Sequence, residues 1–280
     1  MTWVAVAKKD FSDAVQSRSL WALSAFFILL SLGLTYGYSE FEFLSAGTET
    51  TIGGLVFFLG GIVGLFVSIT SIVICYRAIA GERELGSAKI LLSLPHSRLD
   101  VLVGKVVGRT AVLAVPLIIA LGLGLSIGII VIGAGSILSA VIFLGWTFFF
   151  ALVYVSIIVG LSALVSSTTK AAALGIGFFF IVEFLWDGVA FVLLFVANGF
   201  SLPTAAPDWY FVVTQVPPSN AYFSGLVALL PDVAAAVNAS TGAAGFDAFY
   251  AVPEIGIVIL CLWLIVPISI GYTVFSQADL

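Results

Sequence analysis

Apolar runs of about twenty residues recur along the whole chain, and no other feature constrains its fold as strongly. As a helix, each run is long enough to cross the roughly 30 Å of hydrocarbon in a bilayer. With 61% hydrophobic and 9% charged residues, the chain holds more apolar surface than a water-soluble core could cover. The runs are continuous rather than alternating, which argues against a transmembrane β-barrel. The sequence therefore predicts an all-α integral membrane protein, with residues 1–280 forming one transmembrane domain.

The apolar runs predict six transmembrane helices. We expect them at Leu20 to Tyr38, Gly53 to Tyr76, Thr110 to Ile132, Ile137 to Val165, Ala171 to Ala197 and Ile255 to Phe275. Two connecting stretches, 77–109 and 198–254, are longer than simple turns require. The second contains an apolar stretch from Ala221 to Leu230. At about ten residues this stretch is too short to span, so we expect an interfacial or re-entrant helix there.

The distribution of basic residues predicts the orientation of the chain. With six spans, all ten Lys and Arg residues fall on one side of the membrane. The opposite side carries the acidic residues Glu40, Glu42, Glu49, Asp208, Asp232, Asp247 and Glu254. Because Lys and Arg near span ends are retained in the cytoplasm, we expect both termini and stretch 77–109 to be cytoplasmic, and stretch 198–254 to be external. Adding or deleting one span would scatter the basic residues over both sides, so the charges support the count of six.

The first nineteen residues, 1–19, predict an interfacial amphipathic helix. The residues of its apolar face recur at helical spacing and are Trp3, Val4, Ala7, Phe11, Ala14 and Val15. Lys8 and Lys9 face away from them, as expected for a helix lying on lipid headgroups. The alternative is a solvated N-terminal arm, which would leave an exposed Trp and Phe without a reason.

Two glycine pairs have the spacing that lets transmembrane helices approach closely. They are Gly60-x-x-x-Gly64 and Gly124-x-x-x-Gly128. The spacing predicts that these helices pack against neighbours, but it does not identify the neighbours.

Motifs for catalysis or metal binding are not found in the sequence. The Gly104-Lys105 pair has Leu99 where a phosphate-binding loop needs its first glycine, and it is not followed by Ser or Thr. There is no H-E-x-x-H motif and no G-x-S-x-G motif. Cys75 and Cys261 lie singly in apolar runs, which favours neither a zinc site nor a disulfide. We expect no catalytic residue, no metal site and no cofactor in this chain, and no nucleic-acid partner.

Stretch 77–109 carries the most specific pattern in the chain. It contains an acidic Glu82-Arg83-Glu84, a Gly86-Ser87 step, the segment Leu-Leu-Ser-Leu-Pro-His-Ser-Arg over 91–98, and a Gly-Lys pair before the third span. This pattern resembles the loop between the second and third spans of ABC-2 type transporter permeases. Within that family it is most similar to the branch containing the permease of nitrous-oxide-reductase maturation.

The resemblance implies a transporter subunit with defined partners. In the family this loop carries a coupling helix that docks into a separate ATP-binding subunit, and two permeases pair with two such subunits. ATP and Mg would then be bound by the partner. The residues expected to dock are Glu82, Glu84, Gly86, Ser87, Leu91, Leu94, Pro95, His96, Ser97 and Arg98. An external accessory protein is a further expected partner.

The residues of stretch 77–109 also favour docking on their own. Charges flank a short apolar helix expected over Ala88 to Leu94, which Pro95 ends, and Ser97 is placed to cap the next helix. An apolar Ile-Leu-Leu at 90–92 between charged flanks favours contact with a partner surface. The alternative is a solvated loop whose charges only maintain the orientation of the protein.

Two acidic residues interrupt the fifth expected span. Glu183 and Asp187 are one helical turn apart, which would put both on one face, and we expect that face to point into the bundle. An acidic group at mid-membrane costs about 2.5–3.5 kcal/mol on insertion scales, so some compensation is expected. The two residues could form a proton or substrate path, or they could make a structural hydrogen bond to another helix with one carboxyl protonated.

The leading hypothesis for function is the membrane permease subunit of an ABC-2 type ABC transporter, working as a homodimer. Two alternatives belong to other classes. One is a secondary transporter that uses protons through Glu183 and Asp187. The other is a membrane scaffold that assembles partners and transports nothing.

Overall fold

The computed structural model describes residues 3–16, 18–41, 50–86, 97–133, 136–203, 205–241 and 252–278, and within these ranges the regular structure is helical. Its elements are α1 (Trp3–Val15), α2 (Arg18–Glu40), α3 (Ile52–Cys75), α4 (Ala80–Glu84), α6 (Arg98–Ile132), α7 (Ile137–Ala163), α8 (Thr168–Phe178), the π-helix η1 (Phe179–Phe184), α9 (Trp186–Ala197), α10 (Asp208–Thr214), α11 (Pro218–Leu229), α12 (Pro231–Thr241) and α13 (Ile255–Gln277).

Five of the described helices are long and apolar enough to cross a membrane: α2, α3 with its continuation into α4, α6, α7 and α13. They coincide with five of the six expected spans. Two bent pairs of helices pass the same test only when each pair is counted as one span, so the number of candidate spans is five to seven. The all-helical membrane fold is confirmed, and the count of six stays a prediction.

The fifth expected span is not a straight helix. The stretch from Ala171 to Ala197 is divided among α8, η1 and α9, and its two halves meet at 45° around Leu185. The two halves pass the test for a membrane span only when they are counted together, so this span stays a prediction. In stretch 198–254, the helix expected over Ala221–Leu230 is present as α11, and α12 bends away from it by 112°.

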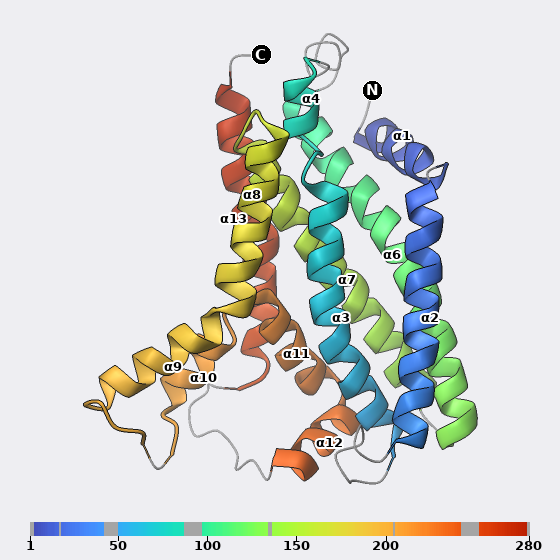
Figure 1. Cartoon of the computed structure of the whole chain (residues 1–280), viewed down its shortest axis with the longest axis vertical. Coiled ribbons are helices and arrows are strands. Elements are labelled where there is room, and N and C mark those ends of the chain that lie inside the picture. Colours follow the sequence, from blue (N-terminus) through green and yellow to red (C-terminus); the bar gives the residue numbers. More distant parts are fainter. Residues whose placement is uncertain are drawn as a thin grey trace.

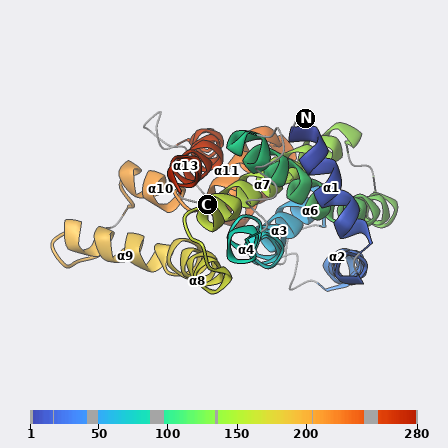
Figure 2. The same ribbon diagram turned by 90° about the horizontal axis from the view of Figure 1, so that it is seen from above.

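The long helices form a bundle along the long axis of the molecule (Figure 1). The start of α2, the short helix α4 and the end of α13 lie at one end, with α1 across it, and α12 lies at the other end. Both views show α9 and α10 projecting from the side of the bundle (Figures 1 and 2). Because α2 begins and α13 ends at the same end of the molecule, this arrangement is compatible with an even number of crossings.

Helix α7 forms the centre of the bundle and packs against α3, α6, α11 and α13 (Figure 2). Its Phe150 and Tyr154 are fully buried. The ring of Tyr222 on α11 stacks on Phe150 with centroids 4.4 Å apart, and the Tyr222 hydroxyl lies 2.8 Å from Thr147 Oγ1. The Trp146 indole donates to the Tyr222 carbonyl at 2.9 Å. These bonds satisfy the polar groups that α11 brings into the core.

Both predicted glycine pairs lie at close helix contacts. A Cβ added to Gly60 would lie 2.7 Å from Leu226 Cδ1 of α11, so α11 packs against the glycine pair on α3. The pair on α6 receives α2, because Gly124 faces Ser31 and Thr35, and a Cβ on it would lie 3.0 Å from Thr35 Oγ1. The close packing expected from the spacing is confirmed, and the neighbours are now identified.

The expected N-terminal helix is present as α1, which lies across α6 (Figure 2). Of the six residues assigned to its apolar face, Ala7 is buried in the protein, whereas Trp3 and Val4 are 42% and 49% exposed. The surface that packs on α6 includes Val6 and the acidic Asp10, which the periodicity did not place there. The location of α1 at a lipid interface stays a prediction.

Candidate functional site

The turn that leads from α3 into α4 is fixed to α7 by one serine. Ser162 Oγ accepts the N–H groups of Ile79 and Ala80 at 3.2 and 3.1 Å, and its hydroxyl donates to the Tyr76 carbonyl at 2.8 Å. All three groups belong to the backbone at the point where stretch 77–109 begins. Ser162 is buried, and nothing in its sequence context distinguishes it from other serines in apolar helices.

Helix α4 caps the turn between α7 and α8. Arg83 Nη1 donates to the carbonyls of Ala163 and Val165, each at 3.2 Å. Glu84, which was expected to face an ATP-binding subunit, accepts the Thr168 N–H at 2.9 Å with its Oε2. These side chains satisfy carbonyl groups at the end of α7 and an N–H group at the start of α8 that lack partners within their own helices.

The start of α6 is fixed to the end of α13. Ser97 caps α6 as predicted, in a capping box with Asp100: Ser97 Oγ accepts the Asp100 N–H at 3.0 Å, and the Ser97 N–H donates to Asp100 Oδ2 at 3.1 Å. Arg98 Nη1 donates to the carbonyls of Phe275, Ser276 and Ala278, the last two at 2.7 and 3.0 Å. Arg98 therefore caps the last turn of α13, in addition to any role in docking.

Five of the ten residues expected to dock lie in the described structure: Glu82, Glu84, Gly86, Ser97 and Arg98. They stand on either side of segment 87–96. The other five, Ser87, Leu91, Leu94, Pro95 and His96, and the short helix expected over Ala88 to Leu94, lie outside the described residues. Gly86 has φ +70°, a left-handed conformation that favours glycine. Docking of these residues on an ATP-binding subunit stays a prediction.

Glu183 lies in η1 and joins three elements. The hydroxyl of the buried Tyr154 on α7 and the hydroxyl of Ser219 on α11 both donate to its carboxylate, and the Ser219 N–H donates to Oε1 at 3.3 Å. Ser219 belongs to the first turn of α11, where N–H groups lack helical partners and favour a negative charge. Hydrogen bonds from α7 and α11 thus offset the cost of burying the Glu183 carboxylate. This agrees with the interpretation in which an acidic residue makes a structural hydrogen bond to another helix.

Asp187 lies beyond the bend and differs from Glu183 in its surroundings. It is exposed in the single chain, and Asn220 Nδ2 donates to its Oδ1 at 3.2 Å and to the Thr214 carbonyl at 2.8 Å. The expectation that both carboxylates point into the bundle holds for Glu183 only. A π-helix has more residues per turn than an α-helix, and together with the bend it turns residue 187 away from the face of residue 183.

A cavity of about 200 Å³ lies beside Glu183, between α3, η1 and α11. Its polar wall is formed by Glu183, Ser68, Ser219 and Asn220, and its apolar wall includes Phe179, Phe184 and Phe223. The α3 side includes Gly60, Gly61 and Gly64, which have no side chain to fill the space. Among the described residues, no group of three or more His, Cys, Asp or Glu side chains is placed to hold a metal ion.

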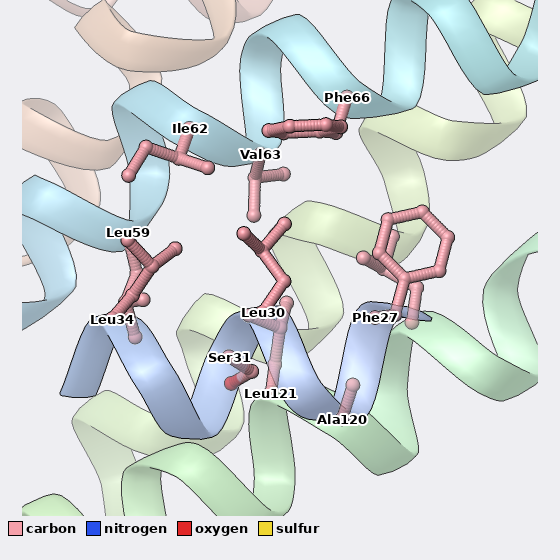
Figure 3. Close-up of a pocket in the computed structure, with 11 residues that line it drawn as sticks. Phe27, Leu30, Ser31, Leu34, Leu59, Ile62, Val63, Phe66, Ala120 and Leu121 are labelled. Carbon is pink, nitrogen blue, oxygen red and sulfur yellow. The ribbon is translucent and has the colours of Figure 1, made fainter. Parts of the chain in front are cut away.

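A second cavity, between α2, α3 and α6, is too small to be a substrate site (Figure 3). Its volume is about 20 Å³, which is enough for a single water molecule. Ser31 is on its wall, and the Ser31 hydroxyl is buried with no hydrogen-bond partner among the described residues. The other labelled side chains are apolar and point into the space between the helices (Figure 3).

Comparison with known proteins identifies the family. The sequence profile described as "ABC-2 family transporter protein" matches residues 4–280. The chain belongs to the ABC-2 family of transporter proteins. It is 28% identical over 217 residues to the probable ABC transporter permease protein NosY of Stutzerimonas stutzeri, and 30% identical over 210 residues to the protein of that name in Pseudomonas aeruginosa. Each match covers 72% of this chain and 74% of the relative.

The comparison confirms the resemblance found in stretch 77–109, including the branch to which it pointed. As an ABC-2 permease with several apolar helices, the protein is a multi-pass component of the cell membrane and a membrane subunit of an ABC transporter. Membership in this family also implies an ATP-binding subunit as a partner.

Proposed function

We propose that this chain moves a substrate across the cell membrane by using ATP that a separate subunit hydrolyses while docked on residues 82–98. Family membership supports the transport function and the existence of the partner. One structural observation supports the docking site. On both sides of segment 87–96 the flanking residues cap other helices with charged side chains: Arg83 and Glu84 before it, and Arg98 after it.

These contacts define how a movement of the docked subunit would reach the membrane-spanning helices. A displacement of α4 acts on the end of α7 through Arg83 and on the start of α8 through Glu84. A displacement of the first turn of α6 acts on the end of α13 through Arg98. One docked surface would thus control α6, α7, α8 and α13 together, which is what alternating access requires.

In this proposal two copies of the chain pair with two ATP-binding subunits, as the family resemblance implied. The end of the bundle with α1, α4 and the end of α13 is cytoplasmic, and α1 lies on the lipid headgroups with Lys8 and Lys9 exposed. Stretch 198–254, which includes α10, is external in this proposal and is the surface on which an accessory protein would act.

A proton-coupled transporter is the second candidate function, and the cavity beside Glu183 favours it. The hydrogen bonds of Glu183 favour the first candidate instead, because a carboxylate that joins α7 and α11 has a structural role without changing its protonation. A substitution of Glu183 distinguishes the proton-coupled transporter from the ATP-driven one only if transport and the packing of α11 are both measured.

The docking surface is tested by one substitution in segment 87–96 and the same kind of substitution at an exposed residue outside it. Leu91→Asp changes the apolar centre of the expected coupling helix, whereas Leu202→Asp makes the same change at an exposed external residue. The tagged protein is extracted from its native host in mild detergent, and co-purifying chains are identified by mass spectrometry. We expect an ATP-binding subunit with the wild type and with Leu202→Asp, and its loss with Leu91→Asp. If the wild type retains no ATP-binding subunit, or Leu91→Asp retains it fully, the proposal is wrong.

A further inference from the structure

Helix α1 packs on a third glycine pair, at the charged start of α6. A Cβ added to Gly104 would lie 2.6 Å from Val6 Cβ, and one added to Gly108 would lie 3.0 Å from the Ala7 carbonyl oxygen and 3.0 Å from Asp10 Cβ. The two helices therefore touch backbone to backbone at a point that only glycine permits. This contact places Asp10, an acidic residue, against α6 in a site where its side chain is 7% exposed.

Two basic residues of α6 surround the Asp10 carboxylate. Lys105 Nζ lies 2.9 Å from Oδ1 of Asp10, and Arg109 Nε lies 2.7 Å from Oδ2. Arg109 Nη2 also donates to Oδ1 at 3.2 Å. Because these charges are largely removed from solvent, salt screens them less than it screens a surface pair, and removal of any one leaves the others uncompensated.

The same basic residues extend the network to two further elements. Lys105 Nζ lies 2.7 Å from Glu82 Oε1 on α4, and Arg109 Nη1 donates to the Ile74 carbonyl near the end of α3 at 3.0 Å. Asp10 and Glu82 supply two negative charges, and Lys105 and Arg109 supply two positive charges, so the four side chains balance. Lys105 bonds to α1 and α4 at once, and it links residues 10 and 82, which are far apart in sequence.

We propose that Asp10 is a positioning residue through which α1 sets the position of α4, the element that precedes segment 87–96. The argument rests on the proposed function only in assigning that segment to an ATP-binding subunit. Arg83 and Glu84 hold one side of α4 on the turn between α7 and α8, and Glu82 holds the other side through Lys105. Movement of α1 at the membrane surface thereby reaches the docking region without passing through the transmembrane core.

The link is tested first without any partner, by hydrogen exchange of the purified full-length chain in lipid nanodiscs. Asp10→Asn removes the charge that holds Lys105 toward α1, and Asp13→Asn makes the same change at an exposed position of the same helix. We expect Asp10→Asn to increase amide exchange in residues 80–84 by about tenfold, as for loss of a charged hydrogen bond. We expect Asp13→Asn to leave it unchanged.

Glu82→Gln tests the link from the other side and remains informative if Asp10→Asn does not fold. It leaves α1 itself unaltered, and we expect faster exchange in residues 3–15. Unchanged exchange of α4 in Asp10→Asn, or of α1 in Glu82→Gln, would overturn the proposal.

A second measurement separates positioning from a loss of folded protein. The ATPase rate is measured per purified complex of wild-type or variant permease with its ATP-binding subunit. We expect Asp10→Asn and Glu82→Gln each to lower the stimulation by the permease severalfold, and the double variant to be no worse than the more affected single one, because both act through Lys105. Equal stimulation in all complexes would contradict the proposal. If no complex forms with the wild type, the proposed function fails, while the exchange result still decides the link.

Discussion

At the scale of single residues, polar side chains hold this bundle together by capping backbone groups of other helices. Ser162, Arg83 and Arg98 each contact two or more backbone groups at helix ends. Lipid offers no hydrogen bonds, so a helix end near the membrane needs such a partner. The groups that these side chains contact belong to the backbone, which is the same for every residue type, so no sequence pattern marks the contacts. The sequence therefore shows that a charge is present in stretch 77–109, but it does not show whether the charge faces a partner protein or the chain itself.

Ser162→Ala should destabilise the protein, because the N–H groups of Ile79 and Ala80 lose their acceptor in a buried turn. Leaving buried donors unsatisfied costs about 1–3 kcal/mol. Unfolding in detergent, followed by circular dichroism, measures the loss. Ser166→Ala, at an exposed position of the following turn, should change stability by less than about 0.5 kcal/mol. Equal stabilities for the two variants would show that Ser162 does not hold the turn.

Glu183→Ala should loosen α11, because Tyr154 and Ser219 lose a shared acceptor. Glu183→Gln keeps one acceptor oxygen, so its effect should be smaller. Hydrogen exchange of residues 218–229 measures this. If Glu183→Gln instead abolishes transport while α11 keeps its wild-type protection, a proton path through Glu183 is supported over the structural role.

At the scale of elements, hydropathy predicted helices well but not where they break. The apolar runs located α2, α3, α7 and α13 within a few residues, because the cost of placing a residue in lipid is a property of that residue. The bend at Leu185 has another origin. It lies between Glu183, which bonds to residues 154 and 219, and Trp186, whose indole donates to the Val213 carbonyl at 2.7 Å. These contacts are distant in sequence, and no proline marks the position.

The crossing of α7 and α13 depends on glycine and gives a matched test within one helix. A Cβ on Gly160 would lie 2.5 Å from the Pro267 carbonyl oxygen, whereas a Cβ on Gly145 would meet nothing within 4 Å. Gly160→Ala should therefore cost about 1–3 kcal/mol through overpacking. Gly145→Ala should be neutral, or stabilising by up to about 1 kcal/mol through helix propensity. Detergent unfolding distinguishes them, and equal effects would mean that α7 and α13 do not cross there.

At the scale of the whole molecule, the charge distribution and the fold agree on which regions share a side. The α4 region, the start of α6 and the start of α8 carry basic residues and lie at the end of the bundle where α13 ends. The spans could be oriented from sequence because each basic residue contributes independently to topology. The network of Asp10 could not be predicted, because the amphipathic pattern assigned Asp10 to neither face of α1, and its burial depends on packing against Gly104 and Gly108, which are distant in sequence.

The predicted topology can be measured with single cysteines in a variant lacking Cys75 and Cys261. A membrane-impermeant thiol reagent should label Leu202→Cys in intact cells, and Ser276→Cys only after permeabilisation. Both positions are exposed in the chain, so reagent access depends on the side of the membrane. Labelling of both positions in intact cells would imply an even number of crossings between them and would contradict the predicted cytoplasmic C-terminus.

The central claim is that an ATP-binding subunit docks on segment 87–96, and site-specific photocrosslinking in native membranes tests it most directly. A photoreactive amino acid replaces Leu91 in one variant and Leu202 in another, and the crosslinked products are identified by mass spectrometry. We predict a covalent adduct with an ATP-binding subunit from position 91 and none from position 202. A position-91 variant that is inserted and folded but yields no such adduct would contradict the account.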